Sequence, residues 1–366
     1  MIISDIPHDL LLDILCRLPV KSLVRFKTVH SEWFSLISNP QFCRQHLQFH
    51  AKQTGQKYGA IELRDRHTLH PSLFLRIIDI VDNHHHDYEL VEIQNVYDKL
   101  VFKRYDYPKL LGCCNGLLLI SLSTCLENFI LWNPTIREYR RIHRENHDRP
   151  LFNVMYMAGI GYDSLNNNYK IVVAESYKFH KDSIEVHIYD LKKSSWEARN
   201  YYFPYKFVLG NTPVITLPNG ILHWHVKTKD EGRNVILSFD LAEEIFNEVP
   251  LPENIYDFSY LSSLDGCLSI GIRRRFAPIY VWKMREYGIK KSWIKLTISF
   301  PIKYRCLGYL MPFEILENYK VVMNVDTKDI AIFDVITHFY EFVPESRRIH
   351  NFTVAAFNQT LVSPYQ

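Results

Sequence analysis

The sequence predicts a multidomain protein in which a small α-helical domain precedes an all-β domain of the propeller type. Two observations predict this division. Residues 6–38 carry apolar side chains at helical spacing between prolines. From about residue 55 that spacing stops, and a strand–turn–strand pattern recurs at roughly fifty-residue intervals. We therefore predict a helical domain at residues 1–48 and a β-domain at residues 49–366.

The first helix is predicted to begin at Pro7, because a proline at this point lacks only an N–H that would have no partner inside the helix. Pro19 ends it, since the residue before a proline avoids the helical conformation. Between the two prolines one broad apolar face is formed by Leu10, Leu11, Ile14, Leu15 and Leu18.

Two more short helices are predicted, at residues 20–29 and 32–38, with Ser31 as the N-cap of the third helix. A weaker helical pattern covers residues 41–49, so the domain is expected to hold three or four helices. A bundle of this size cannot bury all of its large apolar side chains. Each Leu left in water forgoes about 1.5–3 kcal/mol of burial. Either the segment packs on the rest of the chain, or part of its surface binds helices of another protein.

The stretch "IPHDLLLDILCRLPVKSLVRFKTVHSEWFSLISNPQF" resembles the F-box motif over its whole length. The resemblance implies docking on a Skp-type adaptor, and through it on the cullin and RING subunits of a ubiquitin ligase. The positions that match as adaptor contacts are Pro7, Leu10, Ile14, Leu15, Leu18, Pro19, Val20 and Leu23. The side chains expected to leave the bundle are Leu10, Ile14, Leu15, Leu18 and Leu23.

Five more positions match the motif, and each fits a place in the motif's own core as well as it fits an adaptor contact: Phe26, Val29, Trp33, Leu36 and Ile37. The sequence departs from the motif at two positions. Ile6 stands where leucine is usual, and His30 stands where plant members usually carry cysteine. Neither change removes an expected contact.

The remaining chain holds strands separated by Gly, Asn, Asp and Pro, with one recurring element in which an apolar strand ends in a polar turn. The turn positions are Asn133, Asp190, Asp240, Lys283 and Asp334, at separations of 57, 50, 43 and 51 residues. Five copies and a degenerate stretch at residues 55–110 predict six propeller blades of kelch-like type, with seven as an alternative. A pair of β-sandwiches is the other fold considered, and the regular period disfavours it.

The pattern "LLGCCNGLLLI…ILWNPTIREYRRI…GYDSLNNNYKIVV" resembles the F-box-associated domain of plant F-box proteins. The stretch "VWKMREYGIKKSWIKLTI" is also similar to plant S-locus F-box proteins and their relatives. Together with the N-terminal motif, the resemblance covers nearly the whole chain.

Composition restricts the partners and the compartment. A net charge of +3 is too small to predict a nucleic-acid or membrane partner, and the N-terminus has no secretory-signal pattern. The seven cysteines are scattered in apolar contexts, which favours buried free thiols in a reducing compartment. We expect a cytoplasmic or nuclear protein.

Three clusters carry side chains that could bind a metal or react. They are "DNHHHDYE" at residues 82–89, the pair Cys113 and Cys114, and "HWH" at residues 223–225. None has recognised ligand spacing, so we expect a solvated loop, buried thiols and a blade surface, respectively. The recurring aspartates fit turn-capping hydrogen bonds. We predict no catalytic residue, no metal and no cofactor.

Propellers bind partners through loops at one end of the ring. The candidate stretches are residues 144–152, 178–183, 201–211, 227–233 and 273–276, which contain Arg144, Lys178, Tyr205, Lys229 and Arg274. We expect a substrate-recognition subunit of a Skp–cullin–F-box ubiquitin ligase that presents a protein target. The alternatives are an F-box scaffold or inhibitor without ubiquitin transfer, and a propeller enzyme.

Overall fold

The computed structural model describes residues 7–51, 58–64, 73–79, 89–92, 109–122, 126–145, 154–177, 182–208, 215–217, 220–272, 279–298, 310–315, 320–325, 329–337, 339–342 and 353–365. No helix in these ranges is long and apolar enough to cross a membrane.

All four predicted helices form, as α1 (His8–Cys16), α2 (Val20–Phe26), α3 (Ser31–Ile37) and α4 (Pro40–Ala51). The predicted cap of α3 was wrong by one residue. His30 has the extended backbone of an N-cap, and its Nδ1 accepts the N–H of Glu32 at 3.3 Å. The residue that departs from the plant motif thus caps a helix. α4 continues past the predicted domain boundary at residue 48, and the boundary itself stays a prediction.

Within the described ranges, the strands form six antiparallel sheets. The first contains β1 (Tyr58–Arg64), β2 (Leu73–Asp79), β3 (Glu89–Glu92) and the last strand, β25 (Thr353–Phe357). The second contains β4 (Lys109–Cys114), β5 (Leu117–Ser121), β6 (Asn128–Asn133) and β7 (Glu138–His143). The third contains β8 (Val154–Asp163), β9 (Asn168–Tyr177), β10 (Ser183–Asp190) and β11 (Ser195–Tyr202).

The fourth sheet contains β12 (Tyr205–Phe207), β13 (Ile215–Thr216), β14 (Leu222–Thr228), β15 (Asn234–Asp240) and β16 (Ile245–Val249). The fifth contains β17 (Tyr260–Leu264), β18 (Cys267–Ile272), β19 (Ile279–Met284) and β20 (Trp293–Ile298), with the 3-10 turn η3 (Lys290–Ser292) before β20. The sixth contains β21 (Leu310–Ile315), β22 (Lys320–Val325), β23 (Asp329–Asp334) and β24 (Tyr340–Phe342).

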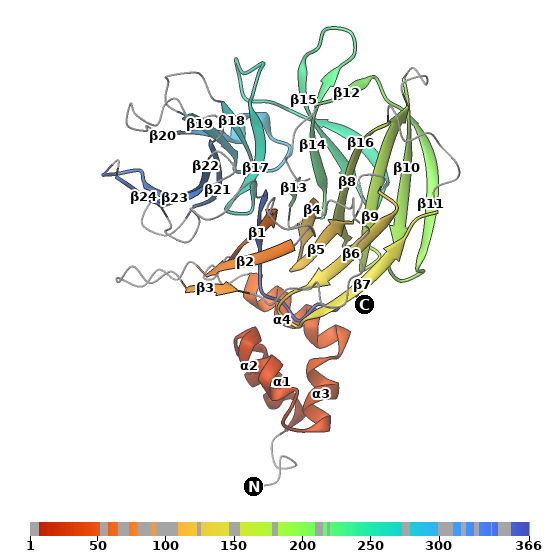
Figure 1. Cartoon of the computed structure of the whole chain (residues 1–366), viewed down its shortest axis with the longest axis vertical. Helices are drawn as coiled ribbons and strands as arrows, with labels where there is room; N and C mark the ends of the chain where they lie inside the picture. The colour runs from red at the N-terminus through yellow and green to blue at the C-terminus, as the bar shows by residue number, and fades with distance from the viewer. Residues whose placement is uncertain are drawn as a thin grey trace.

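The sheets pack side by side around a ring, as blades of a propeller. Successive hydrophobic clusters join the second blade to the third, the third to the fourth, the fourth to the fifth and the fifth to the sixth. β25 contacts both β4 and β21, and it pairs with β1. The last strand therefore closes the ring inside the first blade, and the predicted order of helices followed by a propeller is confirmed (Figure 1).

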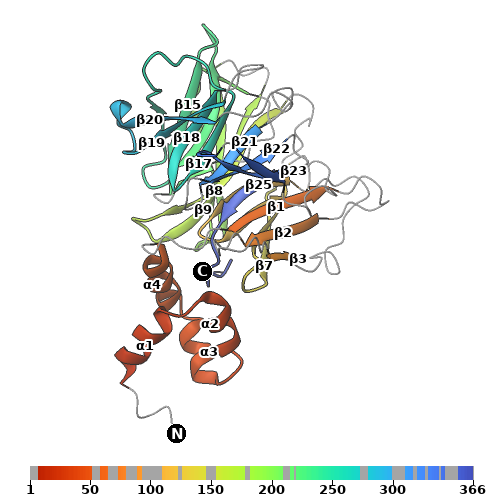
Figure 2. The ribbon, with the colours of Figure 1, turned by 90° about the vertical axis from the view of Figure 1, so that its left-hand side faces the viewer.

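The propeller has two ends, because adjacent antiparallel strands alternate in direction. The hairpin end carries the turns between the first two and the last two strands of a blade. The loop end carries the middle connections and the crossings to the next blade. Ile136, in the turn between β6 and β7, packs against the helical core, so the helices lie at the hairpin end. Figures 1 and 2 show the helices on one side of the sheets, with the C-terminus where the two parts meet.

Candidate protein-docking sites

Helix α1 exposes two large apolar side chains. Leu10 is 57% exposed and Ile14 is 50% exposed, one helical turn apart on the same face. Pro7 and Pro19, which flank the helix, are exposed as well. An exposed apolar pair of this kind is typical of a surface that another protein covers. Of the predicted adaptor contacts, these four are accessible to a partner.

Other predicted contacts lie inside the helical domain. Leu15, Val20 and Leu23 are buried together with Ile37 and Phe42. The expectation that Leu15 and Leu23 leave the bundle is therefore wrong. The broad apolar face of α1 is divided between the core and the surface, and sequence periodicity does not show where that division falls.

Leu18 is half-buried against the same core, and its carbonyl oxygen accepts a hydrogen bond from Nε2 of His46 at 2.9 Å. His50 makes the equivalent contact with the carbonyl of Cys16 at 3.2 Å. These two imidazoles satisfy carbonyl groups left free at the end of α1. Burial lowers the pKa of His46 to about 4, so the ring is neutral at physiological pH.

Two more apolar side chains of the helical domain are exposed: Val29, which the sequence left open as a contact or a core residue, and Phe34, which was not predicted. Val29 and Phe34 are both more than half exposed, and the ammonium of Lys27 lies 5.9 Å from the centre of the Phe34 ring. Phe34 follows Trp33, which packs against the core with Phe26. Trp33 and Phe34 are consecutive in α3, and consecutive side chains of a helix point in different directions. This adjacency is the sequence signal that could have identified an exposed aromatic residue.

The described parts of the predicted substrate-binding stretches lie at the loop end, away from the helices: residues 144–145, 182–183, 201–208 and 227–233. They adjoin either the connection between the middle strands of a blade or the crossing from one blade to the next. Lys178, Arg274 and residues 146–153 fall outside the described residues. Of the five stretches, the described residues include Arg144, Tyr205 and Lys229.

Arg144 does not offer its charge to a partner. Its guanidinium is buried and forms two hydrogen bonds with the Glu175 carboxylate, at 2.5 and 3.1 Å. Its Nε also donates to the carbonyl of Leu126 at 3.1 Å. Arg144 therefore joins the second blade to the third, and target binding by its loop stays a prediction. The sequence shows Arg144 just after a strand, where charged side chains are usually exposed. It does not show that the partner of Arg144, Glu175, lies on another blade.

Tyr205 and Lys229 are accessible in part, and both are also tied to neighbours. The Tyr205 hydroxyl donates to Glu248 at 2.9 Å, and burial together with that carboxylate raises the pKa of Tyr205 to about 12. Lys229 pairs with Asp182 at 3.1 Å and donates to the carbonyl of Phe203 at 2.9 Å. Lys229 thus links loops of the third and fourth blades. A role of either residue in target binding stays a prediction.

The two histidines of the "HWH" cluster have structural partners. His223 is buried, contacts the carbonyl of Ile215 and the hydroxyl of Tyr287, and has its pKa lowered to about 4 by burial. His225 pairs with Asn234 at 2.6 Å. Burial raises the pKa of Cys113 to about 12 and also raises that of Cys114, so both thiols stay protonated at physiological pH. Residues 82–88 fall outside the described residues.

One group of three metal-type side chains occurs within the described ranges. Oxygen or nitrogen atoms of Glu175, Glu185 and His187 lie within 4.8 Å of one another. Both oxygens of Glu175 already accept bonds from Arg144, whose positive charge opposes a cation at this point. The group is better explained as part of the contact between blades.

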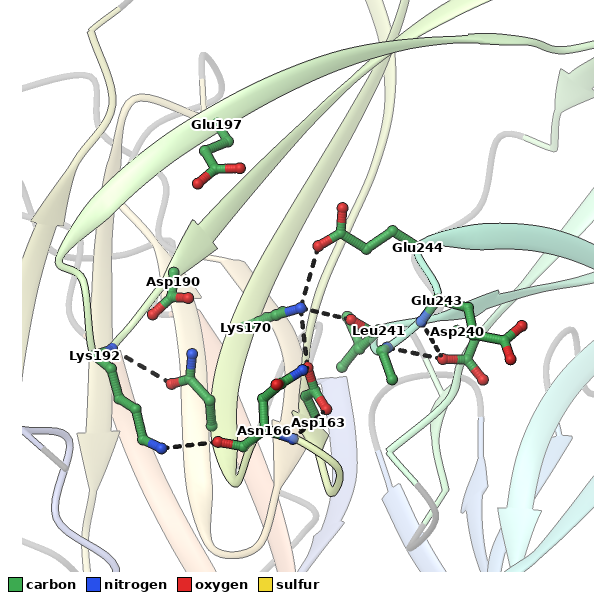
Figure 3. A network of polar contacts seen from close by, with 12 residues as sticks. Asp163, Asn166, Lys170, Asp190, Lys192, Glu197, Asp240, Leu241, Glu243 and Glu244 are labelled. Carbon is green, nitrogen blue, oxygen red and sulfur yellow. Dashed lines mark hydrogen bonds and ion pairs between the residues drawn. The ribbon is translucent and has the colours of Figure 1, made fainter.

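The recurring aspartates cap turns, as predicted, and Asn133 does the same. Oδ1 of Asn133, Asp190, Asp240 and Asp334 accepts a backbone N–H from the turn that follows, at 2.8 to 3.1 Å. In the third blade Lys170 reaches the turn of the fourth blade (Figure 3). Its ammonium bonds the carbonyl of Leu241 at 2.6 Å and pairs with Asp163 and Glu244.

This lysine and its carboxylates do not form a proton-transfer site. Burial alone would lower the pKa of Lys170, but the bonds to Asp163 and Glu244 outweigh burial and raise it. Lys170 is therefore held as a cation, which excludes it as a neutral nucleophile or base at physiological pH. The network fixes two blades to each other.

Known proteins share both parts of this architecture. Residues 72–362 match the F-box associated beta propeller domain, and residues 3–45 match the F-box domain. An F-box/kelch-repeat protein of Arabidopsis thaliana is 31% identical over 311 residues, which cover 81% of this chain and 80% of the relative. F-box protein CPR1 of the same plant is 28% identical over 362 residues, covering 91% of this chain and 82% of the relative.

Among solved structures, TolB from Acinetobacter baumannii aligns with a TM-score of 0.46 at 11% identity, over 86% of this chain and 72% of that chain. The narrower likeness to S-locus F-box proteins stays a prediction. The two domain matches and the plant relatives place the sequence unambiguously: the chain belongs to the F-box proteins that carry an F-box associated beta propeller domain.

Proposed function

We propose that this protein is a substrate-recognition subunit of a Skp–cullin–F-box ubiquitin ligase. The F-box helices dock on a Skp-type adaptor, and the loop end of the propeller binds a target protein. The observation that carries the proposal is the exposed pair Leu10 and Ile14 on α1, beside an otherwise closed helical core. Complete burial of such a side chain is worth about 1.5–3 kcal/mol, and an interface would gain roughly half of that from each, because each is already about half buried.

The arrangement of the two domains supports this role. The helices lie at the hairpin end, and the described candidate residues Tyr205 and Lys229 lie at the other end of the ring. A bound target would face away from the adaptor, toward the ubiquitin-carrying enzyme that the cullin and RING subunits hold. Proximity then raises the effective concentration of a target lysine, and the chain itself need only bind and orient. We propose the cytoplasm or the nucleus as the site of this activity.

Copurification with a Skp-type adaptor tests the first step. Leu10→Asp and Ile14→Asp should each weaken binding by about tenfold or more, since 1.4 kcal/mol corresponds to a factor of ten. Leu165→Asp is the matched control, because Leu165 is 80% exposed in a propeller turn and the change is the same. Leu23→Asp should abolish binding by unfolding the buried helical core, which circular dichroism would detect.

Two outcomes would overturn the proposal. One is a folded wild-type chain that does not bind the adaptor. The other is binding that is equally strong in the wild type, Leu10→Asp and Ile14→Asp. Target capture is tested separately, by immunoprecipitation under proteasome inhibition of the full chain and of Leu10→Asp. A target should bind both chains and accumulate ubiquitin with the wild type alone.

A further inference from the structure

The C-terminal segment, defined here as residues 358–365, runs between the two domains after the last strand. Leu361 is 2% exposed and lies in the helical core with Leu15, Leu23 and Phe42. The next residue, Val362, is 1% exposed and lies in the cluster that joins the second and third blades. Two consecutive side chains therefore belong to two different hydrophobic cores.

Polar contacts hold the backbone of the segment to the second blade. The side-chain amide of Asn133 donates to the carbonyls of Thr360, at 3.0 Å, and Val362, at 2.8 Å. The Thr360 hydroxyl donates to the carbonyl of Asn115 at 2.8 Å. A side chain on Gly116 would lie 2.4 Å from that same hydroxyl oxygen, so glycine permits this close approach.

The outer part of the segment is anchored to strand β7 of the same blade. The hydroxyl of Ser363 donates to the Glu138 carboxylate, and the hydroxyl of Tyr365 donates to the carbonyl of Tyr139 at 2.9 Å. Anchors on both sides of Leu361 leave its side chain little freedom to withdraw from the helices. Figure 2 shows the chain end at the place where the helices approach the sheets.

We propose that the C-terminal segment is a structural part of the F-box domain, and that it fixes the direction in which the propeller presents a target. A helical domain of this size has few buried side chains, so one leucine supplied from elsewhere matters to its stability. Because Val362 and Asn133 hold the same segment to the propeller, the two domains move as one body. The consequence for ubiquitin transfer rests on the proposed function, whereas the coupling of the domains does not.

The pair Leu361→Ala and Val362→Ala tests the coupling by hydrogen exchange, since the two changes are adjacent and both truncate a buried aliphatic side chain. Leu361→Ala should accelerate exchange in α1–α4 at least tenfold over the wild type and leave β5 and β9 unchanged. Val362→Ala should accelerate exchange mainly in β5 and β9. Ile336→Ala, at an exposed aliphatic side chain in the turn between β23 and β24, should change neither set by more than about twofold.

The orientation of the two domains is measured as a distribution of distances between two labels. Each label is attached to a genetically encoded non-natural amino acid, one replacing Lys21 in the helices and one replacing Lys193 in the propeller. The wild type should give one narrow distribution, and Leu361→Asp should broaden it. Unchanged exchange in the helices of Leu361→Ala, or an equally narrow distribution in Leu361→Asp, would overturn the proposal. If these measurements agree with it while the wild type fails to bind a Skp-type adaptor, the proposed function fails and the coupling stands.

Discussion

Replacing Arg144 with methionine should strongly destabilise the protein, although the residue lies at the loop end. The change keeps most of the side-chain volume and removes the charge. Three hydrogen bonds are lost, two to Glu175 and one to the carbonyl of Leu126. The Glu175 carboxylate, with its side chain 7% exposed, then remains buried without its main partner.

Breaking a buried ion pair on one side costs about 3–5 kcal/mol, because the remaining charge has lost its hydration and its partner. His187 lies 3.7 Å from Glu175 and can compensate in part if it takes a proton. We therefore expect a loss near the lower bound, about 3 kcal/mol, in the free energy of unfolding. Arg144→Met combined with Glu175→Met removes both charges and should recover most of that loss.

Urea denaturation followed by tryptophan fluorescence measures the free energy of unfolding of the wild type and the two variants. Exchange in β7 and β9 shows whether the loss is local to the contact between blades. A loss below about 1 kcal/mol for Arg144→Met would refute the reasoning, since that is the size expected of an exposed pair. A double variant no more stable than the single one would refute it as well.

Two further predictions concern a histidine and a glycine. Burial lowers the pKa of His46 to about 4 in the folded state. The neutral ring therefore contributes its full share to the free energy of unfolding above pH 6.5, and this contribution is lost as the pH falls toward 4. The loss is on the order of 3 kcal/mol, and His46→Gln should flatten the pH dependence of helical circular dichroism between these limits. Gly220→Ala should lower the melting temperature far more than Gly232→Ala. Both residues have positive φ, but only at Gly220 would the added carbon meet backbone, 1.8 Å from the oxygen of Tyr162, while at Gly232 it meets nothing. Equal shifts would contradict this explanation.

Local signals explain why the sequence predicted the helices and the repeat well. Pro7 and Pro19 limit α1 through their own backbone chemistry. The turn-capping residues Asn133, Asp190 and Asp240 act on N–H groups two or three residues away. Interactions of this range are visible in a single sequence.

Side-chain burial depended on distant partners and was predicted less well. Leu10 and Leu15 lie on the same broad apolar face of α1, and only the packing of the other helices decides that Leu15 is the buried one. Arg144 looked like a surface residue because Glu175 comes from another blade. Leu361 has no sequence pattern that assigns it to a helical domain at the opposite end of the chain.

The C-terminal segment also sets the order in which the protein can mature on the ribosome. The helices are made first, yet Leu361, which completes their core, and β25, which closes the ring, are made last. At typical synthesis rates of about 5–20 residues per second, the early helices wait roughly 15–60 seconds for these residues. Any product that terminates prematurely, before residue 353, lacks both. Ring closure and the completed F-box core are therefore confined to chains translated past residue 361.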